Sequence, residues 1–262
     1  MKQEELNVLV DKKLVTQVGL VEFFENNPSQ LEKLDVNDFV KSGLLTQPTM
    51  NDFIEENGVD ILVNPFIEAF SEEDLNDVFT NGGKVILKSN ITLNQTLTVP
   101  AGKNVTINLN GYTITNQINV DSKYSDIFYV EEGAALTING DGHIEAVDGI
   151  EGYCVFVEGS ATINGGAYKS GKDASDLTNA CIYARGNGSI IISDGEFESA
   201  DGTFVLNLKD SDRETASITA YGGKYHNFDP SNNASEGPNT NFVADGYVSI
   251  QDGDCYIVNP IK

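Results

Sequence analysis

The sequence predicts a mainly β protein, a right-handed parallel β-helix (solenoid) with a small α-helical N-terminal region and a C-terminal capping hairpin. Three observations predict it: a loose repeat with a period in the twenties, short β-branched and aromatic runs between turn residues, and a repeated helix-start pattern upstream. We expect three parts: residues 1–68, a helical repeat region for attachment or oligomerisation; residues 69–228, the β-helix with an N-terminal capping helix; and residues 229–262, a C-terminal cap with a β-hairpin.

The repeated unit is a short apolar strand, a polar turn, a second strand and a corner that contains glycine. The corner glycines are 24, 29 and 28 residues apart, at Gly142, Gly166, Gly195 and Gly223. Runs of Val, Ile, Thr, Tyr and Phe exclude helical repeats. Neither a hexapeptide rhythm nor an LxxLxL pattern is present, and the coil length varies. These features favour the right-handed parallel β-helix among the solenoids.

Both ends of the predicted rod have capping signals, which an open solenoid needs because its terminal strands would otherwise present unpaired edges. At the front, Ser71 is followed by three acidic residues and an apolar stripe, the pattern of an N-capped amphipathic helix. At the back, the run YVSIQDGDCYIV predicts a hairpin with its tight turn at Asp252 and Gly253.

The first third of the chain repeats a helix start. Residues 10–27 align without gaps to residues 40–57, and in each copy a Thr precedes an apolar stripe. A region of this size closes only a small core, so we expect its stripes to pack on a partner. The expected attachment interface consists of Leu20, Phe23, Phe24, Met50, Phe53 and Ile54.

Composition excludes several classes of partner. Forty acidic residues stand against 16 basic ones, a formal charge of −24 in 262 residues. This charge repels nucleic acid and anionic membrane surfaces. The chain has no secretion signal pattern, and no stretch approaches the ~20 apolar residues that span a bilayer. We therefore expect synthesis in a cytoplasm without membrane insertion.

Catalytic constellations are hard to find. A β-helix lyase needs calcium-binding acids and a basic residue on neighbouring coils, but Arg185 and Arg213 have no second basic group one coil away at a matching offset. Lys169 and Lys224 follow corner glycines and are interpreted as solvated. A hydrolase needs clustered aspartates. The candidates by spacing all lie in glycine turns, where Asp is favoured for its geometry: Asp141, Asp148, Asp194 and Asp201.

The sequence contains equally few signals for metal sites or reactive thiols. His143 and His226 are isolated, and no D-x-D-x-D-G loop is present, so we assign no metal ligands. Cys154 and Cys181 each precede an aligned strand, which predicts stacked neighbours at a distance compatible with a disulfide. Cytoplasmic assembly favours reduced thiols. We expect no catalytic residue, no cofactor and no metal site.

Two stretches resemble a known family. NGGKVILKSNITLNQTLTVPAGKNVTINLNGYTIT, from Asn81, resembles the opening coils of pectin-lyase-like β-helix modules found in surface proteins of gut bacteria and in bacteriophage particles. HNFDPSNNASEGPNTNFVADGYVSIQDGDCYIV resembles their closing segment, so the resemblance spans about Gly82 to Val258. It implies the fold more than a function, since this fold hosts lyases, hydrolases, adhesins and phage spikes.

The expected function is a non-enzymatic structural virion protein of a bacteriophage: a head fibre, a capsid decoration or another projecting fibre. Its N-terminal region would attach to capsid or other virion proteins, and the rod would face outward for adhesion to a host surface or glycan. A homo-oligomer, for example a trimer, is expected on the particle surface. The alternatives are a β-helix depolymerase or lyase that acts on host glycan, and a bacterial surface adhesin.

Overall fold

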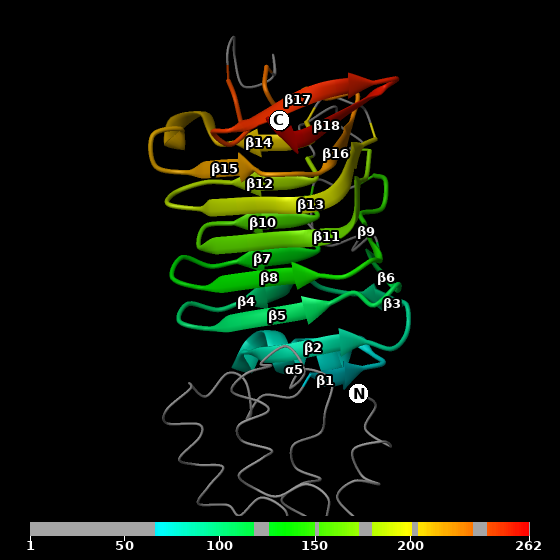
Figure 1. Ribbon diagram of the computed structural model, residues 1–262. Helices are drawn as coiled ribbons and strands as arrows, with labels where there is room; N and C mark the ends of the chain where they lie inside the picture. The colour runs from blue at the N-terminus through cyan, green and yellow to red at the C-terminus, as the bar shows by residue number, and fades with distance from the viewer. Residues whose placement is uncertain are drawn as a thin grey trace, which may run out of the picture. The chain divides into compact units, whose positions relative to one another are not determined.

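The computed structural model describes residues 66–117, 126–149, 152–172, 180–200, 204–232 and 240–261. These residues form the predicted parallel β-solenoid (Figure 1). Its elements, in chain order, are β1 (Ile67–Ala69), α5 (Glu72–Asn81), β2 (Gly83–Leu87), β3 (Ile91–Leu93), β4 (Leu97–Val99), β5 (Asn104–Asn108), β6 (Thr113–Asn116), β7 (Phe128–Val130), β8 (Ala135–Asn139), β9 (His143–Glu145), β10 (Val155–Val157), β11 (Ser160–Ser170), β12 (Ile182–Ala184), β13 (Ser189–Ser199), β14 (Leu206–Leu208), the 3-10 helix η3 (Asp210–Asp212), β15 (Ser217–Ala220), β16 (Lys224–His226), β17 (Tyr247–Asp252) and β18 (Cys255–Pro260).

Each coil passes through three faces. The first face stacks β1, β2, β5, β8, the first halves of β11 and β13, and β15. The second face stacks β3, β6, β9, the second halves of β11 and β13, and β16. The third face is a five-stranded sheet of β4, β7, β10, β12 and β14, so four full turns separate its first strand from its last. In Figure 1 the coils rise with the right-handed crossover that parallel strands prefer.

The corner between the first and second faces is made by stacked glycines. β11 and β13 run straight through it, and both bend at glycines with positive φ, 90° at Gly166 and 134° at Gly195. A Cβ atom on Gly195 would lie 3.1 Å from the Gly166 carbonyl oxygen, so the two residues stack on adjacent coils. The corner-glycine prediction is confirmed.

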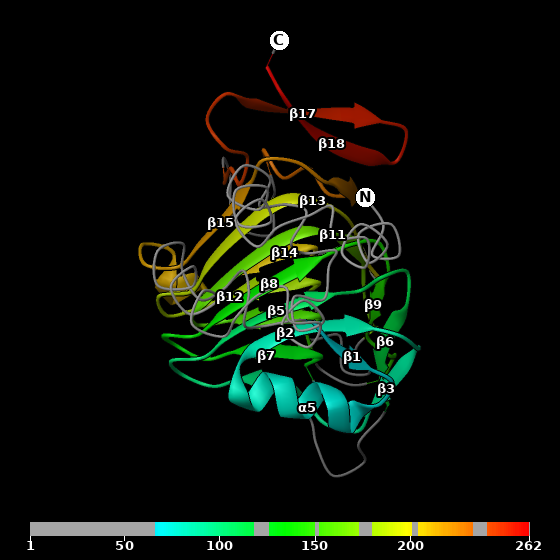
Figure 2. The same cartoon turned by 60° about the horizontal axis from the view of Figure 1, so that its bottom comes forward.

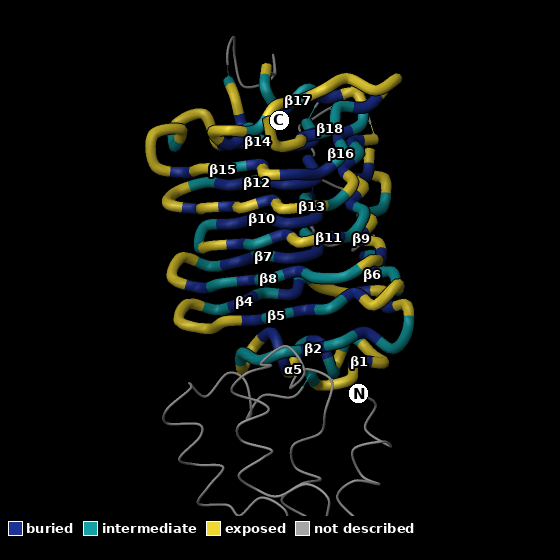
Figure 3. Tube along the Cα trace, in the orientation of Figure 1, coloured by how far each residue is buried: buried dark blue, intermediate teal, exposed yellow. Residues whose placement is uncertain are grey.

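Alternating side chains fill the interior, which Figure 3 shows as buried segments along the strands of the coils. Three aromatic rings form a column beneath the second face: Phe197 stacks on Tyr168 and on Tyr225, with ring centroids 5.0 and 5.1 Å apart. Each buried tyrosine hydroxyl donates a 2.9 Å hydrogen bond to a corner carbonyl, of Gly165 or Gly222. The column therefore buries two phenols without leaving either hydroxyl unsatisfied.

The predicted N-terminal capping helix is α5. The Ser71 hydroxyl accepts from the Asp74 backbone N–H at 3.3 Å, and the Asp74 carboxylate accepts from the Ser71 N–H at 3.0 Å, which completes a capping box. Its apolar side is buried, and the Phe79 ring stacks 5.4 Å from Phe128 of the second coil. The helix thus closes the first coil.

The predicted hairpin closes the other end. β17 and β18 pair antiparallel, and β18 also pairs antiparallel with β16, which ends the parallel stack. Phe228 and Phe242 are 4% and 3% exposed where the last coil ends. Figures 1 and 2 place α5 and the hairpin at opposite ends of the coils.

Candidate functional site

Aromatic side chains gather on the outer side of the third face. Each three-residue strand there buries its first and last residues and turns its middle residue outward. Strand register places the middle residues Tyr129, Phe156 and Tyr183 in one row on successive coils. Tyr153, two residues before β10, joins them. We call these four half-buried residues the aromatic strip.

The rings of the aromatic strip contact one another. Phe156 lies 4.9 Å from Tyr129 and 5.3 Å from Tyr183, measured between ring centroids. Tyr153 stacks nearly parallel on Tyr183, with centroids 4.4 Å apart and an interplanar angle of 9°. The strip therefore forms a continuous aromatic surface that runs across three coils.

Charged side chains border the strip. The Arg185 guanidinium lies 4.6 Å from the centre of the Phe156 ring, and its Nε donates to the Glu158 carboxylate at 2.5 Å. The Tyr129 hydroxyl donates to the same carboxylate. Glu158 also lines a groove of about 520 Å³ at the corner between the third and first faces, with Glu132 and Asn187 among its polar lining residues. The aromatic surface thus borders a groove that carries charged and amide side chains.

The protonation states of this border are set by the contacts. Burial raises the pKa of Glu158, but hydrogen bonds from Tyr129 and Arg185 outweigh it, so the net pKa is lowered. Burial lowers the pKa of Arg185, but Glu158 reverses this and raises it. Burial and the bond to Glu158 raise the pKa of Tyr129 to about 12. Arg185 therefore remains a cation and is unsuited to take a proton as a general base.

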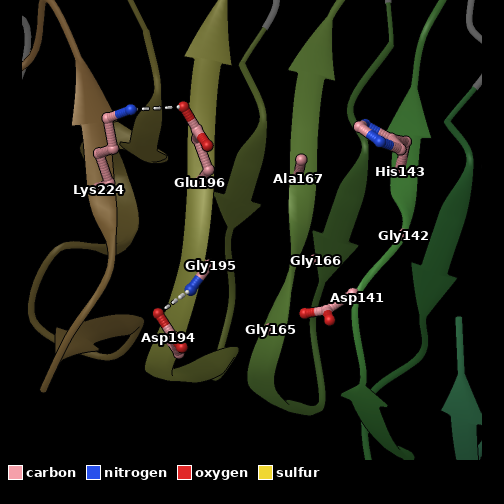
Figure 4. Close-up of a pocket in the computed structure, with 10 residues that line it drawn as sticks. All are labelled: Asp141, Gly142, His143, Gly165, Gly166, Ala167, Asp194, Gly195, Glu196 and Lys224. Carbon is pink, nitrogen blue, oxygen red and sulfur yellow. Dashed lines mark hydrogen bonds and ion pairs between the residues drawn. The ribbon is translucent and has the colours of Figure 1, made fainter. Parts of the chain in front are cut away.

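The corner glycines open a second depression, on the second face. This groove of about 370 Å³ contains Asp141, His143, Asp194, Glu196 and Lys224 beside the glycines (Figure 4). The Asp194 carboxylate accepts from the Gly195 N–H at 2.8 Å, and Glu196 pairs with Lys224 at 2.9 Å. The Asp194 contact is the turn role that the sequence predicts.

The remaining candidates are spread over the rod. The Asp148 carboxylate accepts from the Lys172 backbone N–H at 2.7 Å, Lys169 pairs with Glu198 at 3.4 Å, and Arg213 pairs with Asp210 at 2.9 Å. Lys169 and Lys224 are therefore ion-paired. Asp201 lies outside the described residues.

Two interpretations of the sequence were wrong. Arg185 does have a basic neighbour one coil away, because the pairing of Ala184 with Leu208 aligns it with Lys209. His226 is not isolated: its Nε2 lies 2.5 Å from Glu196 and its Nδ1 lies 3.4 Å from the Cys255 sulfur. Both contacts depend on strand register across 24 to 30 residues, which the sequence alone does not reveal.

Cys154 and Cys181 are stacked neighbours, as predicted. Each directly precedes one of the paired residues Val155 and Ile182, and both thiols are free and fully buried. The predicted attachment interface lies outside the described residues: Leu20, Phe23, Phe24, Met50, Phe53 and Ile54.

The described residues contain no cluster of three or more His, Cys, Asp or Glu side chains placed to hold a metal ion. Over the same ranges, no helix has the length and apolarity needed to cross a bilayer. The aromatic strip was not predicted from the sequence. Its signal there is an aromatic residue at the third position of each of the runs IFYV, CVFV and CIYA.

In comparisons with known proteins, no protein-family model, no curated protein and no solved structure matches the chain. The fold of the described residues therefore rests on the β-solenoid geometry itself.

Proposed function

We propose that this protein is a non-enzymatic structural component of a bacteriophage particle, a head fibre, capsid decoration or other projecting fibre. The N-terminal region attaches it to capsid or other virion proteins, and the rod, of the pectin-lyase-like kind, adheres to a glycan on the host surface. Oligomerisation, for example as a trimer, would multiply weak contacts between rod and glycan.

The observation that carries the adhesive part is the aromatic strip. Aromatic faces stack on the C–H faces of sugar rings, and neighbouring charged groups bind sugar hydroxyls. Tyr129, Phe156 and Tyr183 lie on three successive coils, so a polymer lying along the rod meets one ring on each of these coils. Arg185 and Glu158 supply a donor and an acceptor at its edge.

The charge of the protein favours a neutral glycan over an anionic one. The chain carries a formal charge of −24, which disfavours heavily anionic polymers. Arg185 is already paired with Glu158, so it does not offer an unneutralised cation to a uronate or phosphate. A neutral polysaccharide fits both facts.

Affinity gel electrophoresis with a panel of soluble neutral polysaccharides tests this proposal. We expect at least one polymer to retard the full-length protein. Replacing Phe156 and Tyr183 together by Ala should weaken binding at least about tenfold, equivalent to ~1.4 kcal/mol. The control is Tyr221→Ala, which removes a 42% exposed tyrosine outside the strip and should leave binding unchanged.

The same polysaccharides should show no release of reducing ends or unsaturated sugars. If no polymer binds, or if the Tyr221 variant loses binding as much as the double variant does, the aromatic strip is not the adhesive surface. The oligomeric state of the double variant is measured by sedimentation. If its oligomer dissociates while glycan binding is kept, the aromatic strip is a contact between copies of the chain, which would contradict the proposal.

A further inference from the structure

Cys255, His226 and Glu196 form a row of thiol, imidazole and carboxylate on three strands. Cys255 opens β18 and lies directly opposite His226 in the antiparallel ladder with β16. Its sulfur is 3.4 Å from His226 Nδ1, and the other ring nitrogen, Nε2, is 2.5 Å from Glu196 Oε1 on β13. A nucleophile beside a base, with the base oriented by a third group, is the arrangement that activates thiols.

Glu196 fixes the imidazole in this row. Its Oε1 atom also accepts from Lys224 Nζ at 2.9 Å, and the hydrogen bonds from Lys224 and then His226 lower its pKa despite partial burial. The carboxylate therefore stays an anion next to the Nε2 atom of the imidazole. With Nε2 held by Glu196, Nδ1 is the atom that faces the sulfur.

Other charges face the row. Lys224 of β16 lies close enough for the Cys255 and Asp252 charges to contribute to its raised pKa, after the larger effect of Glu196. Glu198 follows on β13 and is paired with Lys169. Asp252 is opposite Cys255 in the hairpin, and Asp254 precedes it. The row therefore lies among acidic side chains of β13 and the hairpin and beside one cation, Lys224.

The other two cysteines provide an internal contrast. Cys154 and Cys181 are fully buried, and their thiols point at backbone carbonyl oxygens. Burial raises the pKa of Cys154 well above the usual range. Cys255 is also buried but keeps 9% of its surface exposed, and its partner His226 retains 26% of its side-chain surface. Cys255 is therefore the most exposed of the three cysteines.

We propose that Cys255 is a reactive thiol that exchanges with small disulfides, a covalent modification site at the hairpin end of the rod. His226 Nδ1 takes the thiol proton, and the Cys255 thiolate attacks one sulfur of the disulfide. A bond forms between Cys255 Sγ and that sulfur while the disulfide bond of the reagent breaks. The leaving thiolate receives the proton from the imidazolium, so one disulfide is consumed and one thiol is released.

The test treats the reduced full-length protein with oxidised glutathione under native conditions and maps the products by mass spectrometry. We expect one glutathione per chain, on Cys255, whereas Cys154 and Cys181 react only in denaturant. An ordinary thiol loses about tenfold in thiolate per pH unit below its pKa of ~8.5. The Cys255 rate should fall less than this between pH 7 and 6.

Two histidine variants separate activation from simple exposure. His226→Gln should slow the reaction at pH 6 at least about tenfold and restore the ordinary thiol profile, even if the hairpin loosens and exposes Cys255. His143→Gln changes the other histidine, which lies beside Glu145 at 3.7 Å, and should change neither rate nor profile. An unmodified Cys255 in the native protein, or an His226→Gln profile equal to that of the parent, would overturn the proposal.

Discussion

Tyr168 and Phe197 stack inside the rod with ring centroids 5.0 Å apart and planes 11° from parallel. The two residues occupy the same position on adjacent coils, each two residues after a corner glycine. The stack is therefore repeated by the coil geometry itself, and it continues to Tyr225 on the next coil.

Phe197→Ala should remove the central ring of this column. Phe197 is fully buried, so the substitution leaves a cavity between two phenols and should lower the free energy of unfolding by ~3–5 kcal/mol. Urea unfolding followed by circular dichroism measures the change. Ile191→Ala, on the outer side of the same strand and 42% exposed, is the control and should cost less than ~1 kcal/mol. Equal losses in the two variants would contradict the packing argument.

The capping box makes part of the stability depend on pH. Hydrogen bonds from the Phe70 N–H, at 2.9 Å, and from Ser71 lower the pKa of Asp74 below its usual 3.8. A lowered folded-state pKa contributes stability that is present above the unfolded value and is lost as pH falls through the folded one. Asp74→Asn should therefore destabilise the protein at pH 7, and its difference from the parent should shrink below about pH 4.

Urea titrations at pH 7 and pH 3 measure this difference, with Asp77→Asn on the exposed side of α5 as the matched control. A constant difference between the Asp74 variant and the parent across this range would show that the carboxylate charge does not support the cap.

Substitutions at Gly142 and Gly186 distinguish the cost of steric crowding from the cost of backbone strain. Its φ is 150°, and an added Cβ would lie 2.5 Å from the Tyr112 carbonyl oxygen and 2.6 Å from Leu109 Cβ. Gly186 also has positive φ, 63°, but nothing lies within 4 Å of the added atom. Gly186→Ala should cost ~1–2 kcal/mol from the backbone alone, and Gly142→Ala clearly more, because an adjacent coil must shift. Thermal unfolding ranks the two, and the reverse order would contradict the stacked corner.

The attachment hypothesis has a direct test on particles. A chain that begins at Val63 keeps β1, α5 and all coils, so it should fold and remain soluble. It should nevertheless fail to join the particle, because it lacks the expected interface residues, which lie between Leu20 and Ile54. Normal incorporation of the shortened chain, or a stable monomer of residues 1–68 with no affinity for virion proteins, would refute the hypothesis.

Local signals explain what the sequence could predict. Ser71 and the acidic turn after it predict α5 because capping uses neighbours within four residues. Gly166 and Gly195 predict the corner because few other residues adopt positive φ. Gly253, with a φ of 62°, predicts the hairpin turn after Asp252 for the same reason.

Strand register determines the contacts that the sequence could not predict. Arg185 and Lys209 are 24 residues apart, whereas Glu158 and Arg185 are 27 apart, so offsets counted from corner glycines do not align the third face. Cys255 reaches His226 only because the hairpin returns antiparallel onto β16. Loops of unequal length set these alignments, and no single repeat length describes them.

The parallel ladders have a consequence for how such a rod can change over generations. The strand ladders pair each coil with the coil above and the coil below, and each cap packs on the coils near its own end. Duplication or deletion of one whole coil between β7 and β12 would therefore preserve both closures while changing reach by about 4.8 Å. The length of the rod can therefore vary without any change in the two caps.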